Sequence, residues 1–124
     1  VINYCHTKEQ KGEEYSKADV AASFQAAALD VLVEKTIAAA KAKGVTMVTA
    51  GGGVAANTYL REHLSAACKA NGFSLVLPEK RYCTDNAAMI ASEGLVQYRL
   101  GNFAGLELNA KASIPLSKSL VIGR

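Results

Sequence analysis

The residues best able to do chemistry gather in two short segments. The first segment is Gly51-Gly52-Gly53-Val54-Ala55-Ala56-Asn57, which follows a run rich in β-branched residues. Glycine backbone can approach a ligand closely, and free N–H groups at a helix start can face an anion or a sugar. The second segment is Cys83-Thr84-Asp85-Asn86, a polar cluster before a helical stretch. Its Asp85 can serve as one hard oxygen ligand of a metal ion.

Each segment also has a purely structural interpretation. The glycines can form a strand-to-helix turn without any ligand, and Asn57 can hydrogen-bond the N-terminus of its own helix. Thr84 or Asp85 can cap the next helix, which stabilises it by about 1 kcal/mol. No Lys-Ser/Thr pair follows the glycines, so the first segment is not a Walker loop. The spacing alone leaves both interpretations open.

Other residues with metal-binding or nucleophilic side chains give weaker signals. His6 and His63 are far apart without His-x-x-x-His spacing, which argues against a metal site built from them, and we expect His63 to be a surface residue. The three cysteines include no Cys-x-x-Cys pair. This pattern argues against a disulfide framework or a zinc knuckle and fits a reducing, cytoplasmic compartment. Cys83 has no visible base partner, so we expect it to be a small packed residue.

Helices and strands alternate along the part of the chain that must position these segments. Ser16-Lys17-Ala18-Asp19 has the form of a capping box, and Gly44 predicts the end of the long helix that it opens. Runs of β-branched and apolar residues predict strands at 45–49 and 73–77. A second helix precedes the second strand and ends at Asn71-Gly72, and a third helix follows the polar cluster.

Apolar residues at three- and four-residue steps predict one apolar face on each helix. In chain order the faces consist of Val20, Phe24, Ala27 and Val31; of Leu60, Leu64, Ala67 and Cys68; and of Ala87, Ile90, Ala91, Gly94 and Tyr98. We expect the third face to be buried and closely approached by a neighbour, since three of its five residues are small. The polar side of the second helix is expected to face water through Arg61, Glu62, His63 and Lys69.

This order of elements predicts a helix-rich α/β fold with a small parallel sheet and right-handed crossovers. Ligands of open parallel sheets bind beyond the carboxyl ends of the strands, so Asn57 and Asp85 should lie on the same rim. Two strands make a poor sheet, and we therefore expect a partial domain whose other strands precede Val1. Its unpaired strand edges predict that the chain associates with itself.

The composition fits one partial domain over residues 1–124 and excludes other classes of protein. The chain has 14 Lys and Arg and 11 Asp and Glu, and its net charge of +3 is too small for a dedicated polyanion-binding surface. No run approaches the roughly 18 apolar residues that cross a bilayer, and Val1–Tyr4 lacks the pattern of a signal peptide. Residues 8–17 are expected to form an exposed connector and residues 101–124 a tail.

Three motifs carry a resemblance to one protein family. They are Gly52–Arg61 (GGVAANTYLR), Cys83–Ala91 (CTDNAAMIA) and Ala21–Gln25 (AASFQ). Together they are similar to the C-terminal half of the TsaD/Gcp/YgjD family, the tRNA threonylcarbamoyladenosine transferases formerly catalogued as O-sialoglycoprotein endopeptidases. The resemblance implies an actin-like, Hsp70-like ATPase fold, which is ribonuclease H-like, with two lobes, of which this chain is most of the second.

The resemblance also implies roles for four residues. Asn57 contacts the adenylate ligand, and Gly52 and Gly53 lie along the nucleotide. Asp85 completes an iron or zinc site with two histidines of an HxxxH motif in the first lobe. That motif is absent from this chain, so its metal site is expected to be incomplete. The implied reaction transfers threonylcarbamoyl from threonylcarbamoyl-adenylate to a tRNA adenosine next to the anticodon.

Partners and alternatives follow from the same resemblance. A TsaB-like paralogue and a TsaE-like ATPase are implied partners, chiefly through the missing lobe, and the isolated chain is expected to be inactive. Lys111–Leu116 matches the family's tail only in part. The older family name suggests a metal-dependent glycoprotein endopeptidase, yet the chain has no HExxH pattern and no nucleophile with a base. A non-catalytic nucleotide-binding or partner module is the third interpretation.

Overall fold

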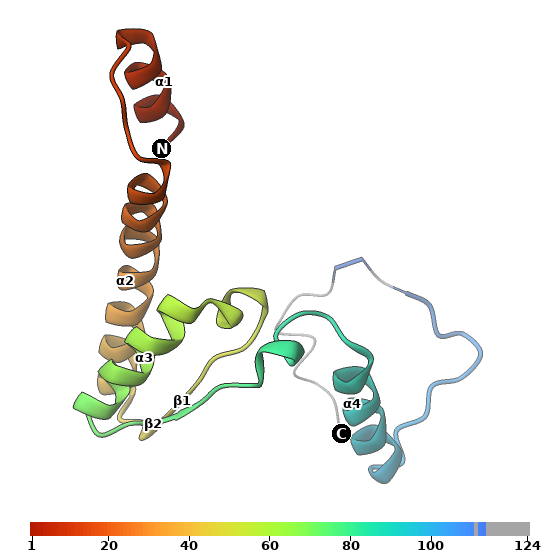
Figure 1. Ribbon diagram of the computed structural model, residues 1–124. Coiled ribbons are helices and arrows are strands. Elements are labelled where there is room, and N and C mark those ends of the chain that lie inside the picture. Colours follow the sequence, from red (N-terminus) through yellow and green to blue (C-terminus); the bar gives the residue numbers. More distant parts are fainter. Residues whose placement is uncertain (111, 114–124) are drawn as a thin grey trace. The chain divides into compact units, whose positions relative to one another are not determined.

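The computed structural model describes residues 1–110, 112 and 113. The chain divides into two compact units, Val1–Thr84 and Asp85–Arg124. A single domain over residues 1–124 stays a prediction. The elements, with η marking a 3-10 helix, are α1 (Ile2–Lys11), α2 (Lys17–Lys43), β1 (Met47–Thr49), η1 (Gly53–Ala56), α3 (Thr58–Ala70), β2 (Ser74–Val76), η2 (Lys80–Tyr82) and α4 (Ala87–Arg99) (Figure 1).

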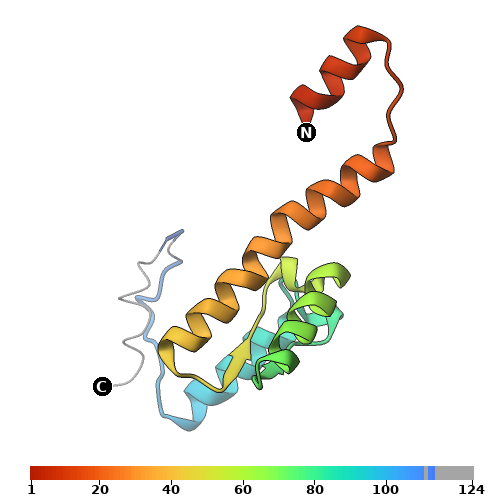
Figure 2. The same ribbon diagram turned by 90° about the vertical axis from the view of Figure 1, so that its left-hand side faces the viewer.

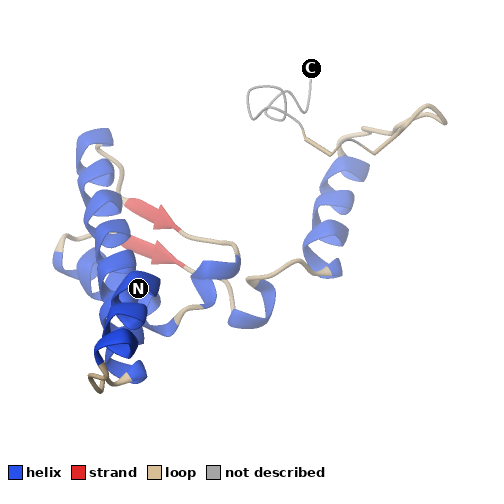
Figure 3. Cartoon of the chain, turned by 90° about the horizontal axis from the view of Figure 1, so that it is seen from above, coloured by secondary structure: helices blue, strands red, loops and turns tan. Residues whose placement is uncertain are grey.

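The described residues form a helix-rich fold with one small parallel sheet, as predicted. Strands β1 and β2 run side by side in the same direction (Figure 3), and Val48 is the Cα partner of Leu75. Backbone bonds continue the pairing at both ends, because Ser74 N donates to Thr46 O at 2.9 Å and Ala50 N donates to Val76 O at 3.2 Å. The chain therefore leaves both strands at the same edge of the sheet.

The predicted boundaries of the long helix are confirmed in α2, but its predicted apolar face is largely exposed. Ser16 Oγ accepts a hydrogen bond from Asp19 N at 3.2 Å, and Gly44 ends the helix with a φ of 63°. Helix α3 lies along the middle and C-terminal part of α2 (Figure 2), and α2 buries Leu29, Ile37 and Ala40. Phe24, in the N-terminal part, is 59% exposed and is not part of the core cluster.

The core of the first unit lies between α2, the sheet and α3. Its buried members are Ile37, Ala40, Val48, Leu64 and Cys68. Burial raises the pKa of the Cys68 thiol. Three of the four residues of the predicted face of α3 are buried, namely Leu60, Leu64 and Cys68, so the periodicity of this helix is confirmed.

Helix α1 was not expected from the sequence. It spans Ile2–Lys11, so the first four residues of the expected connector 8–17 belong to its last turns. Gly12 ends α1 in the left-handed conformation with a φ of 67°, and Lys8 forms an ion pair with Glu13. The charged residues before Gly12 are therefore helical, because Lys, Glu and Gln are good helix formers.

Helix α4 of the second unit buries no residue, so the prediction that its apolar face is buried was wrong. Ile90 is 67% exposed, and a Cβ added to Gly94 would meet nothing within 4 Å. In the described part of this unit, α4 is the only helix or strand, and no second element covers its face. Of the predicted tail, residues 111 and 114–124 lie outside the described residues. None of the described helices has the length and apolarity to span a membrane.

Candidate functional site

The glycine segment that follows β1 is an exposed loop. Gly52 has φ 89° and ψ 172°, a conformation that residues with a side chain rarely adopt. Gly51 and Gly53 are not among the glycines with a positive φ. A Cβ at either position would meet no atom within 4 Å among the described residues. Neither backbone conformation nor packing within the described chain therefore requires glycine at 51 and 53. Close approach by a ligand or by another surface would require glycine at these positions.

Asn57 begins α3 and has a structural role that the sequence left open. Its Oδ1 accepts a hydrogen bond from Leu60 N at 3.0 Å, so it is the N-cap of the helix. Its Nδ2 donates to Gln25 Oε1 of α2, also at 3.0 Å. Both ends of the amide are thus held, and one N–H of Nδ2 is left for a ligand. The contact between Asn57 and an adenylate stays a prediction.

Arg61 does not face water as predicted, but joins the loops that follow the two strands. Its Nη1 donates to Ala55 O at 2.7 Å, and its Nη2 donates to Pro78 O at 2.8 Å. Its Nη1 also lies 3.8 Å from Cys83 Sγ. Arg61 is on the polar side of α3, but its guanidinium lies against two loop carbonyls and is only partly exposed to water. A helical-wheel pattern does not show this, whereas an arginine near the start of a helix that follows a glycine loop could have suggested it.

The loops after β1 and β2 therefore meet, as the parallel strands predict. Elements η1 and η2 contact each other, and Lys80 Nζ donates to Thr58 Oγ1 at 2.8 Å. Cys83 is 3% exposed, which confirms it as a packed residue, and its thiol donates to Glu79 O at 3.6 Å. This arrangement places the glycine loop and the end of the first unit at one edge of the sheet.

Asp85 opens the second unit, and its side chain does not cap α4. The N-cap is Asn86, whose Oδ1 accepts from Met89 N at 3.0 Å, so the capping interpretation of Asp85 was wrong. The residue is exposed, which leaves its carboxylate accessible to a metal ion. Because Asp85 begins a separate unit, its position on one rim with Asn57 stays a prediction.

The described residues contain no group of three or more His, Cys, Asp or Glu side chains that could hold a metal ion. Asp85 fits a metal as a single oxygen ligand, and it cannot hold one alone. His63 is exposed, as expected, and its ring stacks on Tyr59 with centroids 3.7 Å apart. Any complete metal site therefore needs ligands from outside the described residues.

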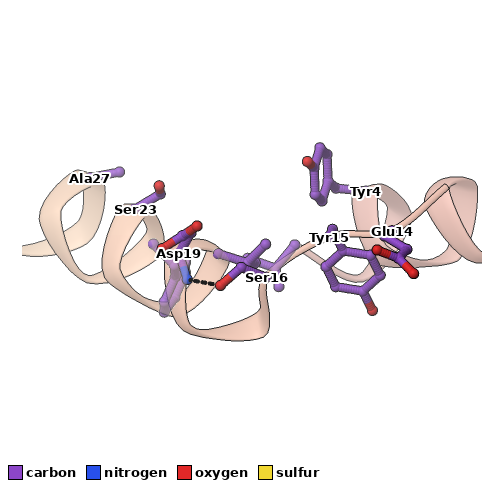
Figure 4. A pocket seen from close by; sticks show the side chains of 10 residues that line it. Tyr4, Glu14, Tyr15, Ser16, Asp19, Ser23 and Ala27 are labelled. Carbon is purple, nitrogen blue, oxygen red and sulfur yellow. Dashed lines mark hydrogen bonds between the residues drawn. The ribbon is translucent and has the colours of Figure 1, made fainter.

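A hollow of about 570 Å³ lies where α1 meets the start of α2 (Figure 4), and neither the glycine loop nor Asn57, Arg61 or Asp85 lines it. Apolar and aromatic side chains such as Tyr4, Tyr15 and Phe24 line it, together with Asp19. No sequence motif predicted this hollow. It lacks a cluster of catalytic groups, and we assign it no chemistry.

Comparison with known proteins identifies the family. The family model for TsaD, tRNA N6-adenosine threonylcarbamoyltransferase, matches residues 2–92. A protein of that name from Clostridium botulinum (strain Kyoto / Type A2) is 47% identical over 118 residues, which are 95% of this chain and 35% of the relative. For the proteins of that name from Moorella thermoacetica and Staphylococcus saprophyticus, the identities are 47% over 117 residues and 48% over 109 residues.

These alignments cover most of this chain but only about a third of each relative. The Moorella alignment covers 94% of this chain and 34% of the relative, and the Staphylococcus alignment covers 88% and 32%. The chain thus spans about a third of the length of the curated relatives it matches. The glycine loop, Arg61 and Asp85 all lie within the matched residues 2–92. The family has an actin-like, ribonuclease H-like ATPase fold. The chain belongs to the TsaD family of tRNA N6-adenosine threonylcarbamoyltransferases.

Proposed function

We propose that this chain forms most of the C-terminal lobe of an enzyme that transfers threonylcarbamoyl from threonylcarbamoyl-adenylate to a tRNA adenosine next to the anticodon. The observation that carries the proposal is the exposed glycine loop of a TsaD-family chain. Gly51 and Gly53 are required neither by a positive φ nor by packing. A loop free of side chains is suited to lie against a flat, anionic nucleotide.

In this proposal the first unit binds the adenylate that leaves during the transfer. Gly52 and Gly53 lie along the nucleotide, and Asn57 contacts it through the free N–H of Nδ2. The orientation of that amide is already set by Leu60 N and Gln25 Oε1. Fixed donors around the leaving group lower the barrier because they need no reorganisation during the reaction.

We propose that Asp85 contributes one carboxylate ligand to a single iron or zinc ion. Its exposure and its freedom from capping α4 support this role. The remaining ligands are two histidines of an HxxxH motif in the other lobe. A metal bound there would supply Lewis-acid polarisation of a carbamoyl or phosphate oxygen. Asp85 would hold such an ion through a carboxylate oxygen. No described residue is assigned as the base for the tRNA amine.

The proposed partners are tRNA and threonylcarbamoyl-adenylate, with TsaB-like and TsaE-like proteins that bind mainly through the other lobe. Self-association of the isolated chain through its strand edges also stays a proposal. We place the protein in the cytoplasm, because its three cysteines are free thiols, which suit a reducing compartment.

Incubation of the full-length enzyme with threonylcarbamoyl-adenylate and unmodified tRNA tests this proposal. We expect the modified adenosine with the wild type and at least about a hundredfold slower formation with Asp85→Ala, together with loss of bound metal. Glu93→Ala removes an exposed carboxylate of α4 and should leave the rate within about twofold of the wild type. A wild type that forms no product contradicts the transferase, and full activity of Asp85→Ala removes Asp85 from the site.

A further inference from the structure

We infer that Arg61 is a positioning residue that clamps the glycine loop to the segment after β2. The inference rests on the proposed function in one respect, which is that the glycine loop binds the adenylate. Arg61 itself is not proposed to touch the ligand. It acts through the backbone of the loop. Its removal should make the loop more mobile while the rest of the fold stays intact.

The clamp consists of two hydrogen bonds from one guanidinium group to two loops. Nη1 donates to Ala55 O within η1, and Nη2 donates to Pro78 O, which lies outside regular secondary structure. At 2.7 and 2.8 Å these bonds have the short lengths typical of charged donors. Arginine suits this position because its planar fork offers several N–H groups in fixed directions.

Arg61 is held by neutral carbonyl groups rather than by a carboxylate. Among the described residues the ion pairs are Lys8 with Glu13 and Arg81 with Glu79, and neither includes Arg61. A partly buried cation without a counter-ion needs its hydrogen bonds to offset lost hydration. Both bonds to the loops are therefore important for keeping the side chain in place, and the loops are held with it.

The bonded carbonyl is close to the proposed ligand contacts. Ala55 lies in η1, shortly after Gly52 and Gly53, and precedes Asn57 by two residues. It is 3% exposed, whereas the glycines are exposed, so it is the anchored part of the loop. Gln25 fixes the loop on the other side through Asn57. Release of Ala55 O would remove the hydrogen bond through which Arg61 ties η1 to the segment after β2.

The test uses the full-length enzyme with Arg61→Met, which keeps an unbranched side chain but removes every N–H donor. We expect the Kd for AMP, used as the probe for the adenylate moiety, to rise about tenfold to a hundredfold. We also expect hydrogen exchange of the amides in residues 51–57 to become about tenfold faster, with exchange in α2 unchanged. Arg81→Met is the matched control, because Arg81 is exposed and pairs with Glu79, and both quantities should stay within about twofold.

Arg61→Lys keeps the charge and can donate to one loop at a time, so it should give an intermediate Kd and an intermediate exchange rate. It also decides the test if Arg61→Met does not fold. Unchanged exchange in residues 51–57 of a folded variant overturns the clamp. Faster exchange with unchanged AMP affinity overturns the positioning role. If wild-type enzyme binds neither AMP nor threonylcarbamoyl-adenylate, the proposed function fails, while the exchange measurement still decides whether Arg61 clamps the loop.

Discussion

Two regions of the chain begin alike and end differently. In both, a strand is followed by a 3-10 helix and then by an α-helix of 13 residues, β1–η1–α3 in one and β2–η2–α4 in the other. Both α-helices are capped by an asparagine, Asn57 or Asn86, with a cap bond of 3.0 Å. Yet α3 buries Leu60, Leu64 and Cys68, whereas α4 buries no residue.

The difference shows which features are set locally and which need a partner. Caps and helical periodicity act within a few residues, so both helices form. Burial needs a second surface, and α3 finds it in α2 and the sheet. The described part of the second unit offers no such surface to Ile90 and Tyr98, which are 67% and 66% exposed.

The largest expected effect comes from truncating one apolar residue on each helix. Leu64→Ala should lower the free energy of unfolding by about 2–5 kcal/mol, because Leu64 is 3% exposed and its loss leaves a cavity. Ile90→Ala should cost less than about 0.5 kcal/mol. Urea denaturation followed by circular dichroism measures both. An equal cost for the two variants would show that the face of α4 is covered in the protein and would break the comparison.

A smaller difference is expected between the two caps. Asn86→Ala should destabilise by about 1 kcal/mol through the lost bond to Met89 N. Asn57→Ala should cost about 1 kcal/mol more, because it also breaks the part-buried bond to Gln25. The same denaturation experiment gives both values, with Gln25→Ala as the control for the second bond. A smaller cost for Asn57→Ala than for Asn86→Ala would contradict this ranking.

The smallest expected effect is on the pKa of Tyr59, whose titration reports the packing of α3 on α2. Tyr59 Oη donates to Asp30 Oδ1 at 2.9 Å, and this bond raises the pKa of Tyr59 above its ordinary value of 10. The folded state thus holds the phenol proton more tightly than the unfolded state. Its stabilising effect is complete below about pH 10 and is lost as pH rises through the raised pKa.

Absorbance at 295 nm follows this titration, and Tyr59→Phe identifies the transition that belongs to Tyr59. Asp30→Asn should move that transition to lower pH, because the charged acceptor is removed. An unchanged transition in Asp30→Asn would show that α3 and α2 are not joined through this pair.

Features fixed by local chemistry could be predicted from the sequence. The capping box at Ser16 and the αL glycine at Gly44 set the ends of α2, and periodicity set the buried face of α3. The parallel pairing of the two strands was also predicted, and the segments after β1 and β2 contact each other through η1 and η2. Caps, turns and period-matched faces need no knowledge of distant residues.

The remaining features depend on neighbours that a pattern does not reveal. The polar position of Arg61 on α3 suggested water, but two loop carbonyls lie there instead. The apolar residues of α4 suggested burial, but α4 buries none of its residues. Asp85 looked like a cap, yet Asn86, one residue later, has the cap geometry. For Arg61 and for the face of α4 the outcome is decided by tertiary contacts, whereas for the cap it is decided by the residue at which the helix begins, which a sequence pattern gives only to within one or two residues.

The most direct test of the account is the affinity of full-length Gly53→Ala for AMP. The structure has space for a methyl group at Gly53, so folding and the urea midpoint should match the wild type. If the loop lies along the nucleotide, the added methyl group should weaken AMP binding by at least about tenfold. Gly94→Ala in α4, where a methyl group also meets open space, should leave the affinity unchanged. Wild-type affinity in a stable Gly53→Ala protein would contradict the proposed contact between the glycine loop and the adenylate.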